Sequence, residues 1–131
     1  MKKRFFVRPN CPAVPEGYNR GEAFEWRIAF EINGVPQGRN NIKGETQGDV
    51  NGWQVKTPKA SLIEKDNCKG YIFGFADSDY YYEMNNAEFA AFRSLFSYLD
   101  YDIKSKSKAK KWRVKNDTKK MRDYLEGKAK A

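Results

Sequence analysis

Apolar positions recur along this chain with two different periods, and the longer period predicts two amphipathic helices. The first helix begins at Asn19, because Glu22 follows it at the spacing of a capping box. Its apolar stripe ends at Asn33-Gly34, a dipeptide typical of helix C-termini. The second helix spans residues 85–99, where another capping box precedes Phe and Leu side chains at helical spacing. We expect its apolar face to pack in the core.

The shorter period predicts a β-sheet. Alternating or continuous apolar residues predict strands over residues 3–7, 71–75 and 80–84. Asn51-Gly52 is the strongest short-range signal for a two-residue type I′ hairpin turn, because both turn positions need a positive φ. The element order predicts an α+β fold of α/β-like character. It has a central mixed β-sheet with a β-hairpin, two main flanking helices and a basic C-terminal tail or helix.

The expected hairpin gathers three polar side chains on one face. With the turn at Asn51-Gly52, Asp49 lies directly opposite Gln54, and the two-residue alternation returns Lys56 to the same face. A carboxylate, an amide oxygen and an ammonium group therefore converge, which suits a hydrolytic metal site. These residue types are also ordinary on the solvent face of a hairpin, where they stabilise only weakly. Both interpretations stay open.

The length bounds the organisation of the chain. At 131 residues it is long enough for one domain and too short for two. We expect that domain over residues 1–103, followed by a basic extension over residues 104–131. No apolar run approaches the roughly 20 residues that span a bilayer. The apolar stretch near the N-terminus is shorter than the core of a signal peptide. The sequence therefore predicts a cytoplasmic protein without membrane attachment, and it leaves the oligomeric state open.

The chain contains no histidine, and Cys11 and Cys68 are its only cysteines. This composition excludes Ser-His and Cys-His catalytic triads, nucleases that depend on histidine, and zinc sites that contain histidine. Hydrolysis by this chain would therefore rely on carboxylates, amides, lysine and a hard metal ion.

Positive charge is concentrated at the C-terminal end. Residues 104–131 hold 12 Lys/Arg against three Asp/Glu, a net charge of +9. Residues 1–103 hold 13 Lys/Arg against 14 Asp/Glu, a net charge of −1. A segregated basic segment is typical of proteins that bind nucleic acid or an acidic partner. Such a segment also occurs as a solvated tail that only increases solubility.

The basic segment supplies the candidate nucleic-acid contacts. Trp112 lies among lysines and arginine, where its ring could stack on a base, and Tyr80, Tyr81 and Tyr82 are further stacking candidates. The expected nucleic-acid-binding residues are Lys106, Lys108, Lys110, Lys111, Trp112, Arg113 and Lys115. This pattern is consistent with a non-catalytic nucleic-acid-binding protein. It is also consistent with a small inhibitor of the phage or plasmid type that docks on a nucleoprotein complex.

The candidate hairpin also resembles a nuclease motif. A helix with a carboxylate, a strand Asp and then Gln54-Val55-Lys56 resemble the PD-(D/E)xK nuclease superfamily in its Gln-x-Lys variant. Members with this variant include transposon end-cleaving endonucleases, so a mobile-element function is one implication. The resemblance extends over about residues 19–99 and implies a mixed sheet flanked by helices. Gln54 departs from the usual acidic residue of the motif.

The resemblance implies a metal-dependent reaction on DNA. In that scheme Asp49 and the Gln54 oxygen hold Mg²⁺ or Mn²⁺, and Glu25 (or Glu22, unless the helix cap uses it) completes the metal shell. Lys56 orients the attacking water or stabilises the charged transition state. The basic extension grips the phosphate backbone without reading its sequence. The expected function is therefore that of a nuclease-like protein that hydrolyses phosphodiester bonds.

Overall fold

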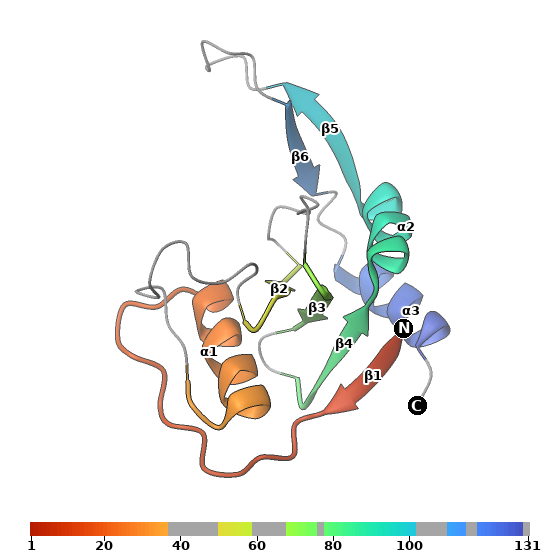
Figure 1. The fold of residues 1–131 in the computed structure, drawn as a ribbon. Coiled ribbons are helices and arrows are strands. Elements are labelled where there is room, and N and C mark those ends of the chain that lie inside the picture. Colours follow the sequence, from red (N-terminus) through yellow and green to blue (C-terminus); the bar gives the residue numbers. More distant parts are fainter. Residues whose placement is uncertain (37–49, 59–67, 76–77, 102–109, 115–117, 130–131) are drawn as a thin grey trace.

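Figure 1 shows the fold of the chain in a computed structural model. For two strands near the C-terminus, over residues 97–101 and 110–114, only the backbone is described. The structure describes residues 1–36, 50–58, 68–75, 78–101, 110–114 and 118–129.

Nine elements follow one another along the described residues. In chain order they are β1 (Lys2–Phe5), α1 (Arg20–Asn33), β2 (Trp53–Lys56), β3 (Gly70–Gly74), β4 (Tyr80–Met84), α2 (Asn86–Phe96), β5 (Ser97–Tyr101), β6 (Lys110–Val114) and α3 (Thr118–Lys128).

Four of the strands form one mixed sheet, in the order β1-β4-β3-β2. Strand β2 runs parallel to β3, whereas β4 runs antiparallel to both β3 and β1. Strands β5 and β6 form a separate antiparallel ribbon. The mixed sheet with its flanking helices confirms the expected α+β fold.

One face of the sheet is covered by α2 and α3. Tyr71 and Phe73 of β3 lie on this face together with Tyr82 and Met84 of β4, and all four are buried. The Tyr71 ring stacks on Phe89 of α2, with ring centres 3.7 Å apart and planes 6° apart. Stacked and edge-to-face rings bury a large apolar area in specific geometries, so this aromatic cluster is the larger part of the core.

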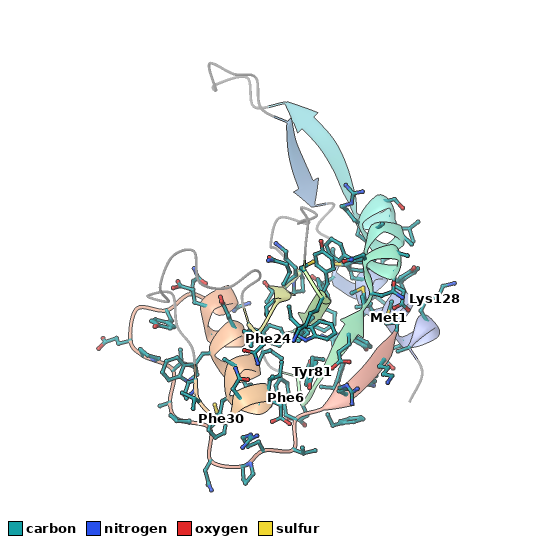
Figure 2. All side chains as sticks on the ribbon, in the orientation of Figure 1. Met1, Phe6, Phe24, Phe30, Tyr81 and Lys128 are labelled. Atoms are coloured by element: carbon teal, nitrogen blue, oxygen red, sulfur yellow. The ribbon has the colours of Figure 1, made fainter. Side chains whose placement is uncertain are left out.

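The opposite face is covered by α1. Phe24 and Ile28 of α1 pack against Ile72 and Tyr81 of the sheet, and all four are buried. Figure 2 shows Phe24, Phe6 and Tyr81 lying together between the helix and the strands. The alternation of side chains along β3 therefore divides the core into an α1 side and an α2–α3 side.

Two glycines of β3 make room on the α1 side. A Cβ at Gly74 would lie 2.3 Å from the Phe24 ring. A Cβ at Gly70 would lie 2.5 Å from the Met84 carbonyl oxygen and 2.8 Å from the Trp53 ring. Because these separations are shorter than van der Waals contact, a larger residue at Gly74 would push α1 away from the sheet, and one at Gly70 would strain the neighbouring strands of the sheet itself.

The first helix begins and ends as its sequence predicts. Asn19 accepts a hydrogen bond from the Glu22 N–H, and the Glu22 carboxylate accepts one from the Asn19 N–H, so the capping box is complete. The helix ends at Gly34, whose φ of 72° lies in the left-handed region that glycine tolerates.

The second helix is shorter than expected. It ends at Phe96, and Leu99, which was expected on its apolar face, belongs to β5. Leu95, also expected in the core, is 51% exposed. The prediction of one helix to Leu99 was wrong, because apolar residues three or four apart fit a helix whether or not the chain changes direction between them.

The final helix is part of the packed body. Met121 and Leu125 of α3 are fully buried in the aromatic cluster of the α2–α3 face. The ribbon joins α2 to α3, and it therefore pairs residues on both sides of the division expected at residue 103. Within the part of the chain that the structure describes, no helix has the length and apolar character needed to cross a membrane.

Candidate functional site

The turn expected at Asn51-Gly52 is confirmed. Asn51 and Gly52 have φ values of 48° and 86°, as a type I′ turn requires. Val50 and Trp53 exchange both backbone hydrogen bonds across the turn, with N–O distances of 3.0 and 2.8 Å. The amides of Asn33 and Asn51 donate to each other, which ties the turn to the end of α1.

The structure places Gln54 and Lys56 on one face of the sheet, as expected. In the parallel register, Gln54 lies beside Tyr71 and Lys56 beside Phe73, so both belong to the α2–α3 side. Gln54 is buried, with 7% of its surface exposed, and Lys56 is half-buried. Asp49, their expected partner, lies outside the described residues.

Glu25 belongs to the other side. It lies on α1, and α1 packs on the face that carries Ile72 and Tyr81. Because Gln54 and Lys56 share the opposite face with Tyr71 and Phe73, the structure does not bring Glu25 together with them across the sheet. Adjacent strand residues point to opposite faces, and a sequence pattern cannot show which face a helix will cover.

The described residues do not by themselves fit a Mg²⁺ or Mn²⁺ site. In the described parts of the chain, no group of three or more His, Cys, Asp or Glu side chains is placed to hold a metal ion. Gln54 contributes a neutral oxygen, whereas Mg²⁺ sites in proteins usually include carboxylates. The assignment of Asp49 and Glu25 as metal ligands therefore stays a prediction.

Strand β6 of the basic segment pairs with β5 in a ribbon that projects from the body (Figure 1). In its antiparallel register, Lys111 lies opposite Asp100, Trp112 opposite Leu99 and Arg113 opposite Tyr98. Each strand has five residues, so the paired part is about 16 Å long. Lys110, Lys111, Trp112 and Arg113 thus lie on a strand, which the sequence did not predict. Lys106, Lys108 and Lys115 fall outside the described residues.

Polar contacts join α3 to the edge strand β1 and to its neighbour β4. Glu126 accepts hydrogen bonds from the Tyr82 hydroxyl and from Lys3 Nζ, the latter at 2.9 Å. These two hydrogen bonds lower the pKa of Glu126. Burial, followed by the hydrogen bond to Glu126, raises the pKa of Tyr82, which therefore stays protonated as the donor. Arg122 donates to the Tyr80 hydroxyl at 2.8 Å.

The three consecutive tyrosines have different environments. Tyr81 is buried below α1, and Tyr82 is buried below α3, so neither offers a ring face to a ligand. Tyr80 is half-buried at the rim of the α3 side. Beside it lies Phe5, which is 59% exposed and was not among the expected binding residues. Phe5 follows Lys3 by two residues along β1, so the two side chains share a face of the strand. This spacing is the sequence signal that could have identified Phe5 as a candidate binding residue.

Comparisons of the chain with protein-family models, curated proteins and solved structures give no match.

Proposed function

We propose that this protein binds nucleic acid, with DNA as the first candidate, through the β5–β6 ribbon and α3. The observation that carries the proposal is that positively charged residues lie on an element that projects from the body. The segment with a net charge of +9 contains β6 and α3, and the ribbon that β6 forms with β5 stands away from the nearly neutral body. Lysine and arginine side chains bind the phosphate backbone by releasing its counterions.

The dimensions of the ribbon support the proposal. A two-stranded β-ribbon fits the major groove of B-DNA, which is about 12 Å wide. Asp100 is the acidic residue of the paired segment, and Lys110, Lys111 and Arg113 leave the ribbon with net positive charge. The other end of the segment is fixed, because α3 buries Met121 and Leu125 in the core. A projecting cationic element on a rigid base is suited to gripping a polyanion.

Binding to duplex DNA tests the proposal. We expect the triple variant Lys110→Gln/Lys111→Gln/Arg113→Gln to weaken binding at moderate salt by tenfold or more. Each phosphate contact that is lost reduces the number of counterions released on binding, and this release favours the complex. The control is Lys2→Gln/Arg20→Gln/Lys69→Gln, which removes the same charge from the body and should bind nearly as the natural protein does. Equal affinities for the two triple variants would contradict the proposal.

Hydrolysis of DNA stays a separate prediction, which rests on the confirmed turn and on the shared face of Gln54 and Lys56. Cleavage of plasmid, linear and branched DNA with Mg²⁺ or Mn²⁺ tests it. Asp49→Asn and Lys56→Ala would each abolish such cleavage while leaving DNA binding intact. Cleavage that survives both substitutions would exclude the hairpin as the active site. The cytoplasmic location and the alternative partner, a nucleoprotein complex, also stay predictions.

A further inference from the structure

Strands β1 and β4 and helix α3 form an aromatic–basic patch, which we define as the exposed Phe5 and the half-buried Lys3, Tyr80 and Arg122. Phe5 and Tyr80 are register partners on β1 and β4, and their rings lie on the α3 side. Phe5 is 59% exposed, and Tyr80 is half-buried. A large aromatic ring left open beside cations is typical of a ligand-binding surface rather than of a core.

The four side chains of the patch contact one another. The Phe5 and Tyr80 rings meet edge to face, with centres 6.2 Å apart and planes 66° apart. Lys3 Nζ lies 4.2 Å from the centre of the Tyr80 ring and 5.4 Å from that of Phe5. Arg122 donates to the Tyr80 hydroxyl at 2.8 Å. Cation–π attraction therefore holds Lys3 beside the two rings, and a hydrogen bond holds Arg122 at the edge of Tyr80.

The patch is held in place before any ligand arrives. Glu126 accepts hydrogen bonds from Lys3 Nζ and from the hydroxyl of the buried Tyr82, so Lys3 is connected to the core through Glu126. Arg122 lies 4.1 Å above the ring of the buried Phe75. Side chains that are already ordered lose little conformational entropy when they bind, so the arrangement favours affinity.

We propose that the aromatic–basic patch binds an unpaired nucleotide of a single strand, with the base stacked on Phe5 and the adjoining phosphates beside Lys3 and Arg122. This inference rests on the proposed nucleic-acid binding and adds a second contact, away from the ribbon. An exposed ring accepts any base face, and neighbouring cations neutralise the backbone. Bases within a duplex are already stacked on one another, so the ligand is single-stranded.

The position of the patch gives a matched control on the same strand. Arg4 lies between Lys3 and Phe5 in the sequence, but on the other face of the sheet, beside Tyr81. Its guanidinium pairs with Glu83 at 2.7 Å, as Lys3 pairs with Glu126. Lys3→Gln and Arg4→Gln therefore remove the same charge from opposite faces. Val35, an apolar residue 66% exposed just beyond α1, serves as the matching control for Phe5.

The test compares two single strands of equal length, an oligothymidylate and the same backbone made entirely of abasic sites. The full-length protein should bind the strand with bases roughly tenfold or more tightly, since stacking on an aromatic side chain contributes this much. Phe5→Ala should erase that preference, and Phe5→Trp and Val35→Ala should keep it. Lys3→Gln should weaken binding to both strands and lower the salt slope by about 0.7, whereas Arg4→Gln should change neither.

The outcomes separate this inference from the function on which it rests. A base preference that survives Phe5→Ala would overturn the patch as the stacking site, and so would equal losses for Lys3→Gln and Arg4→Gln. The ribbon triple variant should weaken binding to both strands alike and keep their ratio. Failure of the natural protein to bind duplex or either strand would instead overturn the proposed function.

Discussion

The two faces of the four-stranded sheet are stabilised by different means. On the α2–α3 side, aromatic rings stack and interlock around fully buried residues such as Phe92. On the α1 side the apolar cluster is smaller, and polar contacts bind the helix to its surroundings. The Glu31 carboxylate accepts the backbone N–H groups of Val7 and Arg8, at 2.9 and 3.0 Å. Arg27 reaches over to the Ser78 carbonyl at 2.8 Å.

This difference determines where a ligand could bind. The loop after β1 is strapped across α1, where the Trp26 indole donates to the Pro12 carbonyl at 3.0 Å. The α2–α3 side instead leaves Phe5 exposed and Tyr80 half-buried at its rim, and the ribbon begins directly after Phe96, the last residue of α2. We infer that the α1 side serves stability, and that the α2–α3 side carries both stability and binding.

The largest expected loss of stability lies in the aromatic cluster. Phe92→Ala should lower the free energy of unfolding by about 3–5 kcal/mol, because it leaves a cavity among the rings of Phe73, Phe96 and Tyr124. Leu95→Ala on the same helix should cost less than about 0.5 kcal/mol, since Leu95 is exposed. Urea unfolding of both variants measures the difference. Similar losses would mean that the cluster does not dominate the core.

The glycines of β3 give a prediction for the α1 side. Gly70→Ala should destabilise by about 1–3 kcal/mol, because its Cβ would meet the Met84 carbonyl, a backbone atom that cannot move aside. The same substitution at Gly127 of α3 meets nothing within 4 Å. Gly127→Ala should stabilise by a few tenths to about 1 kcal/mol through helix propensity. Thermal unfolding distinguishes the opposite signs, and a tolerated Gly70→Ala would contradict the close approach of Gly70 to the Met84 carbonyl.

Removal of the α1 cap should have a moderate effect. Asn19→Ala deletes the acceptor for the Glu22 N–H and should cost about 1 kcal/mol. Asn19→Ser keeps an acceptor and should recover most of that loss. The equivalent change at Asn85, which accepts from the Glu88 N–H at 2.8 Å, should be similar in size. Loss of helical circular dichroism on heating measures each, and no loss for either cap would contradict the assignment of the helix starts.

The smallest expected effect is the contribution of Glu126 to the loss of stability at low pH. The pKa of Glu126 is lowered from its ordinary 4.5, first by the Tyr82 hydroxyl and then by Lys3. Because the folded state binds fewer protons there than the unfolded chain, the contribution is complete above about pH 4.5 and is lost as pH falls through the lower folded value. Tyr82→Phe should therefore reduce the acid-induced fall in melting temperature. An unchanged pH profile would exclude this contact as a link between α3 and the sheet.

Local chemistry made much of this fold predictable. The Asn19 cap, the Gly34 terminus and the Asn51-Gly52 turn each depend on a few neighbouring residues, and all three are confirmed. The pairing of strands that are distant in the sequence was harder to predict. The parallel partner of β2 is β3, and no local rule identifies a strand that lies beyond an intervening segment of the chain. The side on which α1 packs, which separates Glu25 from Gln54, is likewise set by the whole sheet.

The change from α2 to β5 and the packing of α3 in the core were also beyond the sequence pattern. Deletion of residues 104–131 would remove Met121 and Leu125 from the core together with the ribbon, so loss of binding could follow from unfolding. Substitutions within β6 leave α3 in place, and they isolate the contribution of the ribbon.

The most direct test of the central claim is the salt dependence of DNA binding by the full-length protein. The logarithm of the binding constant should fall linearly with the logarithm of salt concentration, with a slope of about −0.9 for each phosphate contacted. Lys110→Gln/Lys111→Gln/Arg113→Gln should make that slope less steep by up to about 2.7, whereas Lys2→Gln/Arg20→Gln/Lys69→Gln should leave it unchanged. A slope that is unaffected by the ribbon variant, in a protein that still folds, would contradict the account.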